Sequence, residues 1–144
     1  MVQERQESPS SAARPGSVMH KTYVIAVVDD DEAMRMSLSS LLRASGYRVL
    51  GYAAPADYLE SDGPEQTDCL ISDIQMPGMT GLQMHAALQA RGWGMPVIFV
   101  SAHQSDLLCA KSRETDVVAC LRKPFAAHEL IAWVEVALRK SENT

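Results

Sequence analysis

The sequence predicts a doubly wound α/β domain, in which helices cover both faces of a parallel sheet. The 144 residues are 47% hydrophobic and 22% charged, which is the balance of a single globular domain with a full core. Short apolar runs rich in β-branched residues alternate with longer segments of helical periodicity. This alternation implies right-handed βαβ crossovers, which make neighbouring strands parallel.

The first strand and helix show the pattern clearly. Tyr23–Val28 is continuously apolar, which is typical of a strand covered on both faces. It stops at the acidic run Asp29–Asp31. Leucines at helical spacing follow, and Gly46 is a natural C-terminal stop for the helix that they predict.

The later elements repeat this order. Strands are predicted at Tyr47–Tyr52, Cys69–Ser72, Val97–Val100 and Val117–Leu121. Helices are predicted near Pro55–Glu60, Leu82–Arg91 and Ser105–Arg113, and along an apolar stripe from Leu130 to Leu138. Five strands and five helices in this order favour a flavodoxin-like sheet with strand order 2-1-3-4-5. In that order the first and third strands are neighbours, and ligands bind beyond their carboxyl ends.

The unusual polar residues all follow predicted strands. They are Asp29 and Asp30 after the first strand, Asp73 after the third, Ser101 after the fourth and Lys123 after the fifth. Carboxylates brought this close repel one another unless a cation lies between them. Oxygen ligands without a nearby His or Cys favour a hard cation, so we expect Mg²⁺.

This set of residues predicts phosphoryl transfer. A carboxylate beside Mg²⁺ can attack phosphorus and form an aspartyl phosphate, and Asp73 is the candidate nucleophile. The ammonium of Lys123 and the hydroxyl of Ser101 can stabilise the transferred group. Taken singly these residues have simpler explanations, and Asp31 is equally well explained as the N-cap of the first helix. Their joint occurrence in strand order favours a site.

Four segments resemble the receiver domains of bacterial response regulators, and the details are most similar to the FixJ-like subgroup. They are Val-Val-Asp29-Asp30-Asp31-Glu32, Leu-Ile-Ser-Asp73-Ile-Gln-Met-Pro77-Gly-Met-Thr-Gly81, Val-Ser101-Ala102 and Arg-Lys123-Pro124-Phe125. The resemblance implies that Asp73 becomes a 4-aspartylphosphate, with a sensor histidine kinase as phosphodonor. It also implies contacts to the phosphate from Ser101 and Lys123, and a cis peptide before Pro124. The metal ligands that it implies are Asp29, Asp30, Asp73 and the backbone carbonyl of Gln75.

Two positions depart from the family pattern. Cys120 stands where the family usually has a Tyr or Phe that rotates on activation, so the usual aromatic switch is not expected here. Asp116 stands where Gly commonly follows the fourth helix, a position at which left-handed geometry disfavours Asp. We therefore expect ordinary phosphorylation with an unusual readout.

Composition and resemblance together set the expected organisation and partners. Residues 1–20 lack a hydrophobic period and predict a disordered tail, followed by a receiver domain at 21–141 and a short tail at 142–144. No output domain is expected, so the signal would pass to a protein partner or a homodimer through the face of the fourth helix, fifth strand and fifth helix. The net charge of −5 disfavours direct DNA binding, and the apolar runs are too short to span a membrane. A cytoplasmic protein is expected, with no catalysis beyond its own Mg²⁺-dependent phosphorylation and dephosphorylation.

Two other functions stay open at this point. A pseudo-receiver would bind a partner constitutively, which the cysteine at position 120 favours. A phosphatase of the haloacid-dehalogenase type would use Asp29 as nucleophile and Asp31 as acid and base, but it would leave Asp73 unexplained. The histidines His85, His103 and His128 lack metal-ligand spacing and are expected at the surface or on helix faces.

Overall fold

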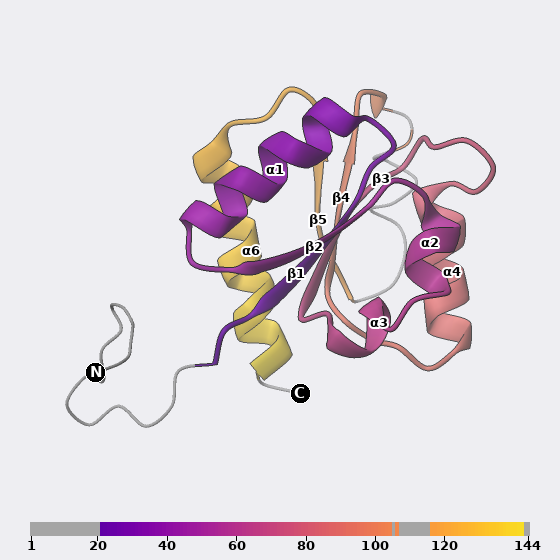
Figure 1. Cartoon of the computed structure of the whole chain (residues 1–144). Coiled ribbons are helices and arrows are strands. Elements are labelled where there is room, and N and C mark those ends of the chain that lie inside the picture. Colours follow the sequence, from indigo (N-terminus) through magenta and orange to yellow (C-terminus); the bar gives the residue numbers. More distant parts are fainter. Residues whose placement is uncertain (1–20, 105, 107–115, 143–144) are drawn as a thin grey trace.

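The computed structural model describes residues 21–104, 106 and 116–142, and it confirms the predicted fold class (Figure 1). The five strands form one parallel sheet in the order β2-β1-β3-β4-β5, as predicted. The strands are β1 (Val24–Val28), β2 (Arg48–Tyr52), β3 (Cys69–Asp73), β4 (Val97–Ser101) and β5 (Val117–Arg122). The helices are α1 (Glu32–Ala44), α2 (Pro55–Leu59), α3 (Gly63–Gln66), α4 (Gly81–Ala90) and α6 (Ala127–Glu142).

Two predicted segments fall wholly or mostly outside this description. The predicted tail at 1–20 lies outside the described residues, as does the predicted helix at Ser105–Arg113 apart from Asp106. Among the helices of the described ranges, none combines the length and apolar character needed to cross a membrane.

Helices cover the sheet on two faces, and the alternation of side chains along β1 explains how. Ile25 and Val27 join the core cluster beneath α1 and α6, whereas Ala26 and Val28 join the cluster beneath α2 and α4. Successive side chains of a strand point to opposite faces, so a strand that is apolar at every position serves both clusters. Figure 1 shows α1 and α6 on one side of the sheet and α2, α3 and α4 on the other.

The short helix α3 was not predicted. It spans four residues, too few to show a helical period, and Pro64 lies in its first turn. A buried hydrogen-bond chain holds it: the Tyr58 hydroxyl donates to Oγ1 of Thr67 over 2.9 Å, and the Thr67 hydroxyl donates to the carbonyl of Gly63 over 2.6 Å. The helix therefore depends on tertiary contacts that sequence periodicity does not reveal.

Candidate functional site

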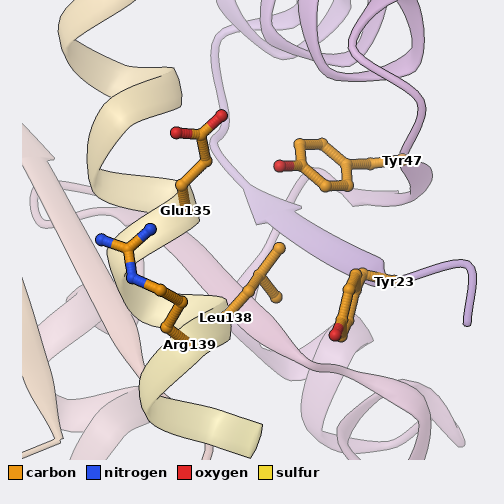
Figure 2. A pocket seen from close by; sticks show the side chains of 5 residues that line it. All are labelled: Tyr23, Tyr47, Glu135, Leu138 and Arg139. Atoms are coloured by element: carbon orange, nitrogen blue, oxygen red, sulfur yellow. The ribbon is translucent and has the colours of Figure 1, made fainter.

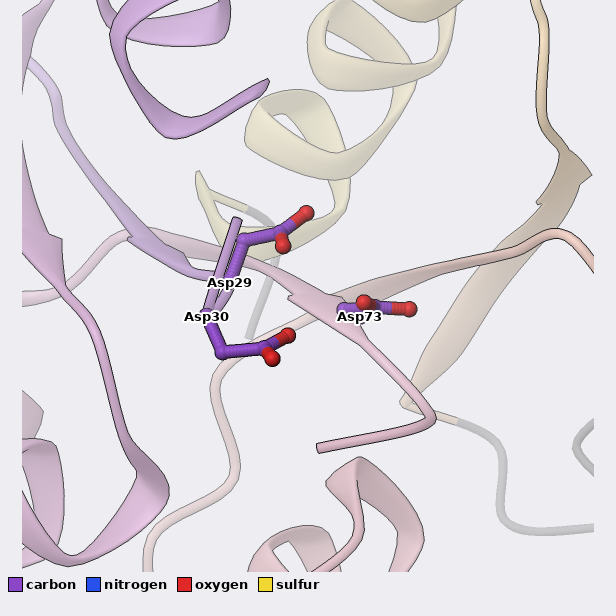
Figure 3. Close-up of side chains that lie close together, drawn as sticks. All are labelled: Asp29, Asp30 and Asp73. Atoms are coloured by element: carbon purple, nitrogen blue, oxygen red, sulfur yellow. The ribbon is translucent and has the colours of Figure 1, made fainter. Parts of the chain in front are cut away.

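Three aspartates gather at the carboxyl end of the sheet (Figure 3). Strands β1 and β3 are neighbours, and Val28 lies opposite Ser72, so the residues that come next are Asp29 and Asp73. With Asp30, they place carboxylate oxygens within 4.8 Å of one another. Asp29 is 1% exposed and Asp73 is 8% exposed, while Asp30 is exposed. The structure therefore brings the predicted acidic residues together where the topology places a ligand.

Lys123 lies between the two buried carboxylates. Its Nζ atom is 3.1 Å from Oδ2 of Asp29 and 3.4 Å from Oδ2 of Asp73. The backbone positions it: the Lys123 N–H donates to the carbonyl of Ser101 over 2.8 Å, and the peptide bond to Pro124 is cis, as the family resemblance implied. The end of β5 thus places the Lys123 ammonium group beside the carboxylates at the ends of β1 and β3.

These contacts shift the acid–base properties of the site. Burial, together with the nearby Asp29 carboxylate, raises the pKa of Asp73 above its ordinary value, and this outweighs the lowering effect of Lys123. For Lys123, burial lowers the pKa, but the carboxylates of Asp29 and Asp73 outweigh burial and raise it. The lysine is therefore held as an ammonium ion within the acidic cluster.

The remaining predicted residues, Ser101 and Gln75, both donate hydrogen bonds to the carboxylate of Asp106, which the sequence did not indicate as a site residue. Ser101 is fully buried at the end of β4, and its hydroxyl donates to Oδ2 of Asp106 over 3.1 Å. The side-chain amide of Gln75 donates to both carboxylate oxygens of Asp106, over 3.1 and 3.0 Å. Asp106 lies within a predicted helix and carries no sequence signal of its own, so only the fold reveals this contact.

The loop after Asp73 packs tightly beneath the site. Ile74 N–H donates to Oδ1 of Asp73 over 2.8 Å, and Gly81 N–H donates to the carbonyl of Ile74 over 2.8 Å. A Cβ atom at Gly81 would collide with the backbone carbonyl of Asp73, so glycine is required for this close approach. Thr80 and Gln83 then form a capping box that starts α4.

Asp31 is the N-cap of α1. Its side chain accepts a hydrogen bond from the N–H of Met34 over 3.2 Å, and its own N–H donates to Oδ1 of Asp29 over 2.9 Å. Arg35 donates from Nη1 to the carbonyl of Asp29 over 2.8 Å, another contact that the sequence did not indicate. The side chain of Asp31 is engaged in capping the helix, which disfavours its role as acid and base in the phosphatase hypothesis.

His85 lies on a face of a helix, one of the two expected positions, but the expectation of a surface position is wrong. His85 is 1% exposed on α4, and its Nε2 atom lies 3.1 Å from Oδ2 of Asp116. Its ring makes an edge contact with Phe99 of β4, with 5.7 Å between ring centroids. Met84 and Leu88 are also buried on α4. Because residues three apart share a helix face, the spacing between His85 and Leu88 could have indicated that His85 is buried. Asp116, which replaces the usual glycine, therefore has a specific partner.

Cys120 lies on the sheet face covered by α2 and α4. It is partly buried, lies opposite Phe99 in the β4–β5 register and packs against the core cluster of that face. A cysteine side chain is much smaller than an aromatic ring, and the absence of the usual aromatic switch stays a prediction.

A cavity of about 220 Å³ lies at the opposite end of the sheet (Figure 2). It is lined by Tyr23, Tyr47, Glu135, Leu138 and Arg139. Tyr23 precedes β1 and Tyr47 precedes β2, so the cavity opens at the amino ends of the strands. Burial, with a smaller contribution from Glu135, raises the pKa of Tyr47. None of the predicted site residues lines this cavity.

Comparisons with known proteins agree with this geometry. The family model described as the response regulator receiver domain matches residues 25–135. The transcriptional regulatory protein FixJ of Azorhizobium caulinodans is 34% identical over 123 residues, which cover 85% of this chain and 58% of FixJ. The response regulator protein TodT of Pseudomonas putida is 34% identical over 119 residues, covering 83% of this chain and 52% of TodT. The chain thus spans about half the length of these relatives.

Solved structures give the same result. The response regulator StyR superposes with a TM-score of 0.79 at 32% identity, over 85% of this chain and 62% of that one. The crystal structure of FixJ-N superposes with a TM-score of 0.74 at 26% identity, over 87% of this chain and 98% of that one. The predicted resemblance to FixJ-like receivers is therefore confirmed, and the chain belongs to the family of response regulator receiver domains of two-component systems.

Proposed function

We propose that this receiver accepts a phosphoryl group on Asp73 from the phosphohistidine of a sensor histidine kinase. The observation that carries the proposal is the position of Lys123, whose Nζ atom lies 3.4 Å from Oδ2 of Asp73 while the carboxylates of Asp29 and Asp30 complete an acidic cluster. Phosphoryl transfer to an aspartate requires a carboxylate nucleophile, a neighbouring ammonium group and oxygen ligands that can bind a metal ion.

The transfer is a displacement at phosphorus. A carboxylate oxygen of Asp73 forms a bond to phosphorus as the P–N bond of the donor breaks, and the imidazole nitrogen keeps the bonding electron pair. Lys123 stabilises the negative charge on the oxygens of the transferred group, because its ammonium already faces Asp73. Ile74 N–H holds the other Asp73 oxygen, which fixes the direction of attack.

The residues present fit a magnesium ion. Asp29, Asp30 and Asp73 offer carboxylate oxygens within 4.8 Å of one another, with neither sulfur nor nitrogen in the group. With the carbonyl of Gln75, they would hold Mg²⁺, which when bound supplies positive charge against the phosphoryl oxygens. The pKa of Asp73 is raised first by burial and then by the Asp29 carboxylate, and a bound cation would offset both effects.

Ser101 is the proposed second contact to the phosphoryl group. It is fully buried at the end of β4, next to β3, and Val100 lies opposite Asp73 in the register of the two strands. A hydroxyl at this position can donate to a phosphoryl oxygen and couple the modification to the segment after β4.

We propose that the signal leaves the domain through protein contacts, in a cytoplasmic two-component pathway and without direct DNA binding by this domain. The net charge of −5 supports the last point, because a DNA-binding surface needs clustered cations. The proposed face comprises the fourth predicted helix, β5 and α6, since Ser101 and Lys123 lie at its base. Most of that predicted helix falls outside the described residues, so β5 and α6 carry this part of the proposal.

A phosphoramidate salt tests the proposal, because its P–N bond imitates phosphohistidine. The wild-type chain with Mg²⁺ should gain one phosphoryl group that is lost in base, as measured by intact mass, and chelation of Mg²⁺ should prevent the gain. Asp73→Asn should remain unmodified, while Asp57→Asn, at an exposed aspartate of α2, should behave as wild type. Equal modification of the Asp73→Asn chain would contradict the proposal. Steady hydrolysis of a phosphomonoester that Asp29→Asn abolishes would favour the phosphatase instead.

A further inference from the structure

Asp106 accepts the hydrogen bond of the Ser101 hydroxyl, the group that is proposed to donate to the phosphoryl oxygen. The Ser101 hydroxyl donates to Oδ2 of Asp106 over 3.1 Å, and Ser101 Oγ accepts from the N–H of His103 over 3.0 Å. A hydroxyl has only one proton to donate. While that proton is directed at Asp106, Ser101 cannot donate it to a phosphoryl group on Asp73.

Gln75 ties Asp106 to the loop that carries the nucleophile. Its amide donates to both carboxylate oxygens of Asp106, and Gln75 lies two residues after Asp73. The carboxylate thus receives hydrogen bonds from the ends of β3 and β4 at once. In the resting domain Asp106 links the two strand ends that phosphorylation would change.

Charge makes this arrangement sensitive to phosphorylation. A phosphoryl group carries about −1.5 to −2 charges near neutral pH, and like charges at short range repel. Ser101 Oγ is within hydrogen-bond distance of Asp106 and is also the proposed donor to the phosphoryl group, so both anions compete for one proton. The phosphoryl group is the stronger acceptor because it is fixed by its covalent bond to Asp73 and carries more charge.

We infer that Asp106 is the resting ligand of Ser101, and that phosphorylation of Asp73 displaces it from both Ser101 and Gln75. This inference rests on the proposed function, and it provides a readout that needs no aromatic residue at position 120. Displacement of Asp106 breaks the side-chain link between Gln75, after β3, and Ser101, at the end of β4. Phosphorylation would thus change the hydrogen-bond acceptor of the Ser101 hydroxyl from Asp106 to the phosphoryl group.

The inference also makes Asp106 a determinant of the phosphorylation rate. An incoming phosphodonor is an anion, and it must displace a charge-assisted hydrogen bond before Ser101 can assist it. Replacing Asp106 with alanine should therefore raise the rate with acetyl phosphate by about tenfold, the effect of losing one such bond. Asp106→Asn keeps a similar shape and an acceptor oxygen but loses the charge, so its rate should fall between wild type and Asp106→Ala.

The experiment uses the side-chain amide signals of Gln75 in ¹⁵N–¹H spectra of the full chain, with acetyl phosphate and Mg²⁺ as the phosphodonor mixture. In the unphosphorylated, metal-free state, Asp106→Ala should shift these signals relative to wild type, because their acceptor is lost. Phosphorylation of the wild type should shift them in the same direction, whereas Asp73→Asn in the same mixture should not respond. Asp57→Asn is the control for loss of one carboxylate elsewhere.

The outcomes distinguish failure of Asp106 displacement from failure of Asp73 phosphorylation. If the wild type gains phosphate but its Gln75 signals stay at the resting position, or if both Asp106 variants are phosphorylated at the wild-type rate, Asp106 is not displaced and the inference is wrong. If the wild type gains no phosphate, the proposed function fails and the inference fails with it. Backbone amide signals that match the wild type away from Gln75 and Asp106 show that both Asp106 variants fold.

Discussion

The ammonium nitrogen of Lys123 lies 3.4 Å from Oδ2 of Asp73, although Asp73 ends β3 and Lys123 follows β5, with β4 between the two strands. The same nitrogen lies 3.1 Å from Oδ2 of Asp29, so one cation bridges the carboxylates at the carboxyl ends of β1 and β3. The site is therefore partly neutralised before any phosphodonor arrives, and the lysine already faces the proposed nucleophile.

Replacing Lys123 with methionine should slow phosphorylation of Asp73. Methionine keeps an apolar stem but removes the ammonium that would stabilise the transferred group, and loss of one such electrostatic contact typically costs about 10²–10³ in rate. The measurement is the initial rate of phosphoryl gain with acetyl phosphate and Mg²⁺. Lys140→Met, at an exposed lysine of α6, is the matched control and should keep the wild-type rate. Equal rates for the Lys123 and Lys140 variants would remove Lys123 from the mechanism.

Adjacent aspartates should differ sharply in magnesium binding. Asp30→Asn removes a carboxylate of the acidic cluster and should weaken Mg²⁺ binding by about tenfold or more, because affinity follows the charge of the ligand set. Asp31→Asn changes the net charge equally, but asparagine is as good an N-cap as aspartate, so both helix and metal site should persist. Calorimetric titration with Mg²⁺ measures both. Weaker binding to the Asp31 variant than to the Asp30 variant would assign the wrong carboxylate to the metal.

His85 and Asp116 should behave as a coupled pair in folding. Each buries one atom without a hydrogen-bond partner among the described residues, His85 Nδ1 and Asp116 Oδ1, and they share one contact of 3.1 Å. Asp116→Ala leaves the buried His85 ring without its partner, and His85→Ala leaves the partly buried Asp116 carboxylate without its partner, so each should lower the free energy of unfolding by about 1–3 kcal/mol. The double variant should lose less than the sum of the two.

Urea unfolding of the four chains in this cycle measures the coupling. His128→Ala, at an exposed histidine of α6, is the control and should change the free energy of unfolding little. Strict additivity of the His85 and Asp116 effects would show that their contact does not contribute to stability.

The His85–Asp116 contact shows which parts of the structure can be predicted from the sequence and which cannot. Strand order and the strand-end positions of Asp73, Ser101 and Lys123 were predictable, because apolar runs mark buried strands and parallel topology collects their carboxyl ends. The partner of Asp116 was not predictable, since it lies on a helix far away in the sequence and only packing of α4 on the sheet brings His85 to it.

Asp106 illustrates the same limit at the site itself. Its contact to Ser101 spans only five positions, yet its contact to Gln75 spans 31, and neither follows a periodic pattern. A lone aspartate in a predicted helix is indistinguishable from a solvated surface residue until its neighbours are known. Side-chain partners across loops therefore required the structure.

Stability should fall with rising pH in a way that depends on Cys69. Burial raises the pKa of this thiol from 9.0 to about 12 in the folded chain. Between these values the unfolded chain releases the proton and the folded chain keeps it, so the unfolded state binds fewer protons and unfolding becomes more favourable as pH rises. Relative to Cys69→Ala, the wild type should lose up to about 1.4 kcal/mol of unfolding free energy per pH unit in this window.

Urea unfolding of the wild type and Cys69→Ala across that window measures the difference. Burial also raises the pKa of Tyr58, but this contribution is common to both chains and cancels in the comparison. Parallel curves for the two chains would mean that Cys69 ionises in the folded state as readily as in the unfolded state.

Identification of the modified residue tests the central claim most directly. The chain is incubated with phosphoramidate and Mg²⁺, the acyl phosphate is reduced with borohydride to mark its position, and the digested peptides are sequenced by mass spectrometry. The account predicts the mark on Asp73 in the wild type and no mark in Asp73→Asn. A mark on Asp29, Asp30 or any other residue of the wild type, or no mark at all, would contradict it.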